Sequence, residues 1–290
     1  MRDPVSQPRR FAVAYHPNLP EAAVEAHSIT RSLQEVGAER VEVASLYDNV
    51  LMNHIQDRIF DVLIAVGGDG TMLRAGRLCA PAHLPVLGIN LGHFGFLIEL
   101  RPADWPARLA LLMEGGYHLE DRMTLHAEHW NGSERLGAWD VLNEVVVCRG
   151  QFVRPVQLTA SVDGYPMSTY VADGLIASTP TGSTAYALAA GGPIMPPELR
   201  NILIIPVAPH LSMDRAIILA EGSSVKIEVE TRHEAVFSVD GHAPITIRLG
   251  EYVQAVTGEN VVTFVRFQDP GYFYRNLSGY REQNHSISGV

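Results

Sequence analysis

The chain has 290 residues, which is enough for one large domain or two domains of ordinary size. Apolar residues make up 47% of it and charged residues 19%, so the composition is that of a folded chain and excludes a disordered one. With 22 Lys and Arg against 32 Asp and Glu, the formal charge of -10 disfavours nucleic acid, a ligand held mainly through its phosphate backbone. A small phosphorylated ligand remains allowed, since a few backbone N–H groups and arginines can bind it locally.

The cysteines and the N-terminus indicate the cellular compartment. Cys79 and Cys148 lie far apart, and neither belongs to a CxxC or Cys/His spacing, so we expect neither a disulfide framework nor a zinc site. The first ten residues lack the apolar run of a secretory signal. No stretch approaches the roughly 18 apolar residues of a membrane span. We therefore expect a cytoplasmic protein with no membrane partner.

The first third of the chain alternates short apolar runs with helical patterns. In the segment 20–36, apolar residues recur on one helical stripe, and Gly37 is a natural stop. This alternation predicts an α/β domain, residues 1–115, with a mostly parallel sheet covered on both faces, although the strand order stays open. The expected strands are 11–15, 41–46, 61–66 and 85–90, and the expected helices are 20–36, 72–78 and 105–113.

After Gly115 and Gly116 the pattern changes to short runs rich in Val, Ile and Thr. Turn dipeptides at 131–132, 163–164 and 240–241 separate them, which is typical of β-hairpins. We predict a β-rich second domain, residues 116–268, for which the resemblance described below implies dinucleotide binding. One segment, 178–190, interrupts it, in which the loop 179–182 opens a helix of small residues. A tail, residues 269–290, can return to the first domain.

The loop Gly67-Gly68-Asp69-Gly70-Thr71 follows a buried strand and precedes a helix. At such a helix start, backbone N–H groups and the positive helix end can cradle phosphate oxygens, and glycines let the backbone approach them. A carboxylate beside an anion is unfavourable by charge, so Asp69 is better explained as a base. A plain Asp-Gly turn is the alternative, and this motif alone does not decide. It is neither GxGxxG nor a P-loop.

Two further stretches offer groups for a nucleotide. Asn143 and Glu144 stand at the start of an expected strand, with Arg154 downstream, and a carboxylate beside an amide can bind a ribose diol or an adenine edge. A solvated strand end is the plainer explanation. The run 173–193 combines hydroxyls, glycines and Tyr186 at a helix start, which suits a nucleotide pocket, and a capped helix explains only part of it.

Taken together, these stretches resemble the NAD kinase family, also called inorganic polyphosphate/ATP-NAD kinases. Diacylglycerol and sphingosine kinases and phosphofructokinases share the first motif in similar form, but they lack the long run 173–193. The resemblance covers about residues 62 to 241. It rests on 67–71 with Leu73 and Arg74, on 88–97, on 143–144, on 173–193 and on 206–210.

The resemblance implies a two-domain NAD kinase-like fold, with Asp69 as the catalytic base and a phosphate loop of Gly67, Gly68, Gly70 and Thr71. His242 stands where many members have Gln, and Val171 where some have a basic residue, so the preference between NAD and NADH stays open. The implied dinucleotide-binding residues are Asp69, Gly70, Arg74, Asn143, Glu144, Arg154, Asp173, Thr184, Ala185, Tyr186, Ala187, Leu188, Ala189, Ala208 and His242.

A metal held by protein side chains is not expected. His126 and His129 differ by an odd number on an expected strand and so point to opposite faces. Phosphoryl transfer nevertheless needs its charge neutralised, which implies Mg²⁺ or another divalent cation bound chiefly through ATP. The resemblance also implies a homodimer or homotetramer.

The expected function is therefore a phosphotransferase, an NAD kinase that transfers the γ-phosphoryl group of ATP to the 2′-hydroxyl of the adenosine ribose of NAD, giving NADP and ADP. Two alternatives stay open: a lipid kinase that shares the 67–71 motif, and a non-catalytic NAD(P) sensor with the same fold. The acidic charge and the lack of a basic amphipathic stretch disfavour the lipid kinase. Whether polyphosphate replaces ATP also stays open.

Overall fold

The computed structural model describes residues 7–91, 95–151, 153–210, 213–269, 271–275 and 277. The chain divides into two compact units, Met1–Asp121 with Val262–Val290, and Arg122–Val261. We expected breaks after residues 115 and 268, whereas this division falls within two long strands, β5 (His118–Asn131) and β16 (Glu251–Arg266). Both strands therefore contribute residues to each unit.

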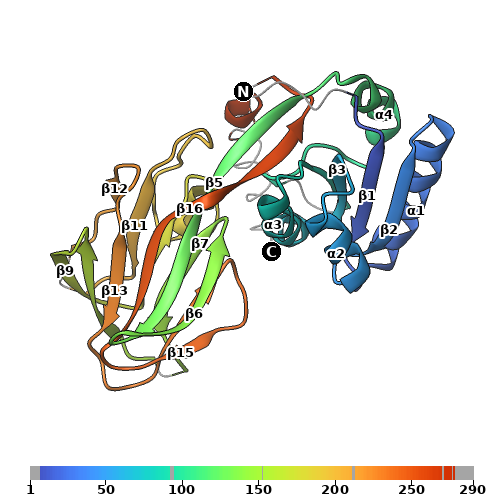
Figure 1. Cartoon of the computed structure of the whole chain (residues 1–290). Coiled ribbons are helices and arrows are strands. Elements are labelled where there is room, and N and C mark those ends of the chain that lie inside the picture. The colour runs from blue at the N-terminus through green and yellow to red at the C-terminus, as the bar shows by residue number, and fades with distance from the viewer. Residues whose placement is uncertain are drawn as a thin grey trace, which may run out of the picture. The chain divides into compact units, whose positions relative to one another are not determined.

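The first unit is an α/β layer structure, as the sequence predicted. Its strands pair in the order β2-β1-β3-β4, all in parallel, and Phe264 of β16 pairs in parallel with Val86 of β4. Figure 1 shows α1 and α3 on opposite sides of β1 and β3. The elements are β1 (Arg10–Tyr15), α1 (Pro20–Glu35), β2 (Arg40–Ser45), α2 (Asn49–Gln56), β3 (Val62–Gly67), α3 (Asp69–Cys79), the short 3₁₀ helix Ala80–Ala82, β4 (Val86–Asn90) and α4 (Trp105–Glu114).

Apolar periodicity explains these elements. Phe11 and Val13 of β1 pack in one buried cluster with Ile29 and Leu33 of α1. Helix α2 was not predicted. Its start carries a local signal, since the Asp48 carboxylate accepts the Leu51 N–H at 2.9 Å.

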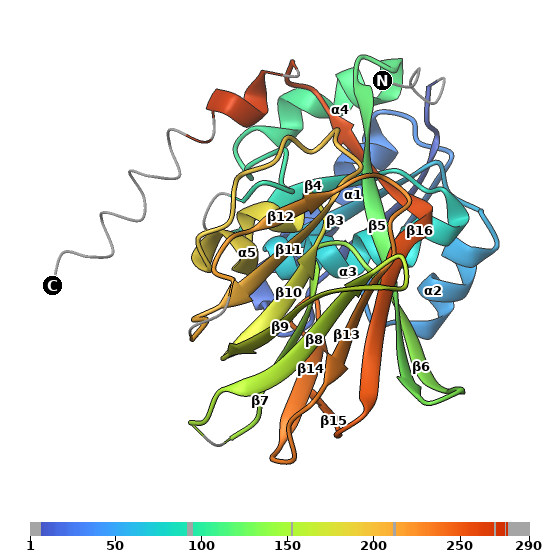
Figure 2. The ribbon, with the colours of Figure 1, turned by 90° about the vertical axis from the view of Figure 1, so that its left-hand side faces the viewer.

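The second unit consists of antiparallel sheets. In one sheet the order is β12-β11-β10-β7-β14-β15, and Figure 2 shows β7, β10 and β11 among its strands. In the other, β9, β8, β13, β16, β5 and β6 follow one another. The remaining bounds are β6 (Glu134–Val141), β7 (Glu144–Arg149), β8 (Val156–Val162), β9 (Tyr165–Ala172), β10 (Gly174–Ser178), β11 (Ile202–Val207), β12 (Ile217–Leu219), β13 (Val225–Val229), β14 (Ala235–Val239) and β15 (Ile245–Ile247).

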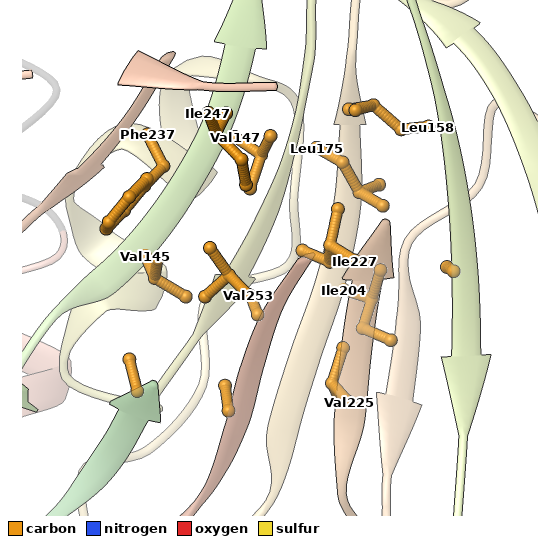
Figure 3. Packing of buried hydrophobic residues seen from close by; sticks show 14 of the residues in the cluster. Val145, Val147, Leu158, Leu175, Ile204, Val225, Ile227, Phe237, Ile247 and Val253 are labelled. Atoms are coloured by element: carbon orange, nitrogen blue, oxygen red, sulfur yellow. The ribbon is translucent and has the colours of Figure 1, made fainter. Parts of the chain in front are cut away.

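The core of the second unit lies between its sheets (Figure 3). Val147 and Leu175 from one sheet and Leu158 and Ile227 from the other belong to a single cluster of buried side chains. Their alternation along each strand places every second side chain in this core. The rigid layer so formed carries the loops at its strand ends.

In the segment 178–190 we expected a loop that opens a helix of small residues ending at Gly191, and the helix is shorter than expected. The structure has a 3₁₀ turn at Gly182–Thr184 and a short helix, α5 (Tyr186–Ala189), while Ser178 ends strand β10. Side-chain hydroxyls in this run bond to nearby backbone groups, and such bonds compete with helical ones. Across the described ranges, no helix is long and apolar enough to cross a membrane.

Candidate active site

Asp69 lies in the first turn of α3, directly after β3. The N-cap residue, Gly68, has extended backbone and no side chain that caps the helix start. The Thr71 N–H donates to the Gly68 carbonyl at 2.9 Å, which leaves earlier N–H groups at the helix start for another acceptor. This is the geometry that binds anions at the carboxyl end of a parallel strand.

The glycines of this loop differ in whether the fold has room for a side chain. A Cβ at Gly67 would overlap the Thr71 side chain, so the fold itself requires glycine there. A Cβ at Gly68 or Gly70 would meet no heavy atom within 4 Å. Nothing in the packing of the described chain excludes a side chain at these two positions, whereas a phosphate approaching the helix start would.

Asp69 is an exposed residue, and the backbone of Gly95 and Leu97 lies against one side of its carboxyl group. The backbone N–H of Leu97 donates to it, and a Cβ at Gly95 would overlap it. Burial by the surrounding protein raises the pKa of Asp69 above its usual value, while the Leu97 N–H and the positive charge of Arg266 oppose the rise. Asp69 is thus a carboxylate of increased basicity that a ligand can reach. Gly95 was not among the predicted site residues.

Glu144 begins β7 in the second unit and is only 7% exposed. The Tyr186 N–H donates to its carboxyl group, but Oε2 has no hydrogen-bond partner within the described residues. Burial, together with the negative charge of Asp240, raises the pKa of Glu144 to about 8. A buried oxygen without a partner is costly, so this atom is placed for a ligand.

Asp240 organises the loop that carries Glu144. Its carboxylate accepts the backbone N–H groups of Leu142 at 2.9 Å, of Asn143 at 2.7 Å and of Glu144 at 3.1 Å. The sequence analysis treated Asp240 only as a turn residue. The Asp-Gly pair does make the turn, with φ of +46° and +70°, but it holds no local signal for these distant bonds.

Three hydroxyls of the run 173–193 bond to nearby backbone carbonyls. Thr179 Oγ1 donates to the Leu142 carbonyl at 2.6 Å, and Ser183 Oγ donates to the Pro180 carbonyl at 2.6 Å. Thr184 Oγ1 likewise donates to the Thr181 carbonyl. These bonds hold the loop in shape, and the nucleotide pocket expected from this run stays a prediction.

Tyr186 lies near several charged groups of the second unit. Asp173 forms an ion pair with Arg149 at 3.2 Å. Burial raises the pKa of the Tyr186 phenol, and nearby Cys148 and Asp173 raise it further. The structure therefore brings Glu144, Asp173 and Tyr186 together, and it adds Arg149, which the sequence analysis did not single out.

The other predicted residues are more scattered. The Arg74 guanidinium lies over the Tyr47 ring, 3.8 Å from its centroid. Arg154 is exposed on the loop between β7 and β8, and His242 is exposed after the 240–241 turn. Ala208 follows β11 with a φ of +45°, a conformation that non-glycine residues rarely adopt. Gly70 and Arg74 belong to the first unit, and Ala185, Ala187, Leu188 and Ala189 surround or form α5 in the second.

The histidines considered as metal ligands have carboxylate partners instead. His129 Nε2 lies 2.9 Å from Glu251 Oε2, and His126 Nδ1 lies 3.0 Å from Asp140 Oδ1. In the described parts of the chain, no three His, Cys, Asp or Glu side chains gather in a way that could hold a metal ion.

Family models match most of the chain. The model of the ATP-NAD kinase N-terminal domain matches residues 10–117, and that of the ATP-NAD kinase C-terminal domain matches residues 142–267. An NAD kinase from Chloroflexus aggregans is 41% identical over 217 residues, 75% of this chain and 79% of that protein. One from Dehalococcoides mccartyi is 33% identical over 270 residues, 93% of this chain and 94% of that protein.

Solved structures match over most of the chain. An NAD kinase from Archaeoglobus fulgidus in complex with ATP has a TM-score of 0.73 and 27% identity, and the match covers 93% of this chain and 97% of that one. Yeast NADH kinase complexed with NADH has a TM-score of 0.82 and 22% identity, covering 96% of this chain and 91% of that one. The yeast structure supports the fold alone.

The raised pKa of Glu144 predicts a pH-dependent stability. Above the usual pKa of a glutamate the unfolded chain releases this proton, and the folded chain keeps it up to a pH of about 8, so stability is lost as the pH rises across that window. Glu144→Gln should therefore raise the thermal midpoint more at pH 8.5 than at pH 5. Glu134→Gln, at an exposed position on β6, is the control. An equal gain at both pH values would contradict a neutral Glu144.

Proposed function

Because the chain belongs to the ATP-NAD kinase family, we propose that it transfers the γ-phosphoryl group of ATP to the 2′-hydroxyl of the adenosine ribose of NAD, giving NADP and ADP. The observation that carries the mechanism is the reachable Asp69 carboxyl at an uncapped helix start. A phosphoryl transfer to an alcohol needs a base for the hydroxyl proton and donors for the phosphate oxygens. The Asp69 carboxyl group and the N–H groups at the start of α3 offer both next to each other.

Asp69 acts as the general base. A ribose hydroxyl is a poor nucleophile at neutral pH, so a carboxylate within hydrogen-bond reach accepts its proton as the phosphoryl group transfers. The raised pKa of Asp69 makes its carboxylate more basic than an ordinary aspartate. The Leu97 N–H keeps the carboxylate oriented.

The start of α3 binds phosphate oxygens of the donor. The positive end of the helix and its free N–H groups attract the negative charge that the transferring group carries. Gly67 permits the tight turn, Gly68 and Gly70 leave room for the phosphates, and Thr71 packs beneath Gly67. ATP is named as a ligand of the Archaeoglobus fulgidus relative, which supports this assignment.

The proposed contacts of the dinucleotide begin with the two residues at the start of β7. Glu144 and Asn143 hold ribose hydroxyls, with the unpartnered Glu144 Oε2 as the atom that gains a partner. Tyr186, 44% exposed, offers a ring for stacking or a phenol for a hydrogen bond. The remaining proposed contacts are Asp69, Gly70, Arg74, Arg154, Asp173, Thr184, Ala185, Ala187, Leu188, Ala189, Ala208 and His242.

A divalent cation, Mg²⁺ by preference, enters with ATP in this proposal. The described residues offer Asp69 as one carboxylate at the phosphate loop but no set of three metal ligands, which fits an ion held chiefly by phosphate oxygens. When bound, it offsets the negative charge of the phosphates. The protein residues supply the base and the orientation.

We also propose a cytoplasmic homodimer or homotetramer whose assembly supports activity. The free thiols of Cys79 and Cys148 agree with a reducing compartment. Specific activity should fall when the enzyme is diluted to concentrations at which light scattering reports monomer, because a neighbouring chain completes the dinucleotide pocket. Constant specific activity in that range would remove the role of assembly.

The decisive experiment is a coupled assay for NADP with NAD, ATP and Mg²⁺. We expect NADP formation and no phosphorylation of diacylglycerol or sphingosine. Binding of NAD without NADP formation would instead support the sensor. Replacing ATP by polyphosphate, and NAD by NADH, in the same assay settles the donor and the acceptor.

Asp69→Asn should lower kcat by about 10² to 10⁴, the usual range for a general base, and leave most of the NAD affinity. Asn is nearly isosteric and still accepts the Leu97 N–H, but it cannot take the hydroxyl proton, so the loss lies in the chemical step. Asp57→Asn, at the exposed end of α2, is the matched control. A near wild-type kcat with only KM raised would make Asp69 a binding residue and the mechanism wrong.

Glu144→Gln should show the opposite kinetic signature. It should raise the KM for NAD more than it lowers kcat, because Glu144 is assigned to holding the dinucleotide in both the ground state and the transition state. Steady-state kinetics at saturating ATP measure the split. A fall in kcat with an unchanged KM would place Glu144 in the chemistry instead.

A further inference from the structure

Arg266, the last residue of β16, carries a fully buried guanidinium group in the first unit. Its Nη1 donates to Glu99 Oε2 at 3.2 Å, and its Nη2 donates to Glu120 Oε1 at 3.1 Å. The same group donates to the backbone carbonyls of Phe96 at 3.3 Å and of Leu97 at 3.5 Å. A buried arginine with this many partners fixes their relative positions, because breaking any bond leaves a buried group unpaired.

Two of these partners, the carbonyls of Phe96 and Leu97, belong to the segment whose backbone contacts the Asp69 carboxylate. Arg266 binds the carbonyls of Phe96 and Leu97, and the N–H of Leu97 donates to the Asp69 carboxylate. Gly95, the residue before Phe96, lies so close to that carboxylate that a Cβ would overlap it. The guanidinium therefore sets the place of the N–H donor behind Asp69.

The C-terminal segment is tied to the same group. Glu99 Oε1 accepts the N–H groups of Phe267 at 2.8 Å and of Gln268 at 3.1 Å. The Tyr272 hydroxyl donates to Glu120 Oε2 at 2.8 Å, and Phe96 packs with Tyr272 and Phe273 in a small buried cluster. The beginning of the predicted tail, Tyr272 and Phe273, thus packs against the partners of Arg266.

The charge of Arg266 also acts on Asp69. It lowers the pKa of that carboxyl, against the larger effect of burial. Glu99 and Glu120 offset part of the positive charge, and Arg74, on the same helix as Asp69, lies over the Tyr47 ring. The segment 95–97 contributes no titratable side chain.

We propose that Arg266 is a positioning residue for phosphoryl transfer: from the end of β16 it fixes the 96–97 backbone, and through the Leu97 N–H it orients the Asp69 carboxylate. This inference rests on the proposed function, in which Asp69 is the base. It gives the C-terminal segment a part in the site, because Glu99, Glu120 and Tyr272 hold Arg266 in place.

The test compares Arg266→Met, Arg266→Lys and Glu120→Gln by two measurements. One is the pH profile of kcat, and the other is the titration of the Asp69 carboxyl by NMR of ¹³C-labelled aspartate, with Asp69→Asn to assign the signal. The NMR titration needs no activity. If the wild-type protein forms no NADP, the proposed function fails, while the titration still decides whether Arg266 acts on Asp69.

We expect Arg266→Met to move the Asp69 titration and the acidic limb of kcat to higher pH, since a positive charge near the carboxylate is lost. The kcat at the optimum should fall by about tenfold or more, because the Leu97 N–H is no longer fixed. Arg266→Lys should restore the titration but only part of kcat, since an ammonium cannot bind both carbonyls and both glutamates in one plane. Glu120→Gln should move both readouts downward.

Leu33→Ala, which creates a cavity in the core of the same unit, is the control for lost stability. It should lower the thermal midpoint and leave both pH readouts in place. If Arg266→Met does not fold, the downward shift in Glu120→Gln carries the proposal. A folded Arg266→Met, or a folded Glu120→Gln, with wild-type titration and acidic limb would overturn it.

Discussion

A guanidinium group that is withdrawn from water must be fully paired, and in the first unit this constraint falls on Arg266. Its pairing requires Glu99, Glu120 and two backbone carbonyls at fixed positions. The loop before Glu99, the strand that contains Glu120 and the end of β16 are thereby joined, and the segment next to Asp69 inherits its geometry from a charge that never meets the ligand. The place of the Leu97 N–H behind Asp69 thus depends on a buried ion cluster as well as on the apolar packing of Phe96.

In the second unit, two neighbouring carboxyl groups, those of Asp240 and Glu144, have different hydrogen-bond partners. Asp240 accepts three backbone N–H groups, whereas Glu144 accepts the Tyr186 N–H and has one oxygen without a partner among the described residues. Burial, together with the nearby charge of Asp240, keeps the proton on Glu144 to a pH of about 8. Asp240 therefore holds the loop together, and Glu144 keeps one oxygen that can accept a further hydrogen bond.

The loop at the start of α3 and the run that ends at α5 also differ in which of their groups are accessible. At the start of α3, Gly68 and Gly70 have open space where a side chain would stand, so the backbone itself is accessible there. In the run that ends at α5, the hydroxyls of Thr179, Ser183 and Thr184 are bound to backbone carbonyls. They hold the loop in a non-helical path and so place the Tyr186 N–H against Glu144.

The sequence alone determined what local patterns determine: the parallel α/β layer around Phe11 and Val13, the Asp163-Gly164 turn with both φ values positive, and the helix start at Asp69. Its motifs also determined the family, because the long run 173–193 is specific. It did not predict that the helix there is short, since hydroxyl-to-backbone bonds and helical bonds draw on the same residues. Only the tertiary structure decided the partners of Glu144 and Asp69. Asp240 and Arg266 reach them from 96 and 169 positions away, as the bonds to Glu144 and Leu97 show, and contacts at such separations leave no periodicity or spacing in a single sequence.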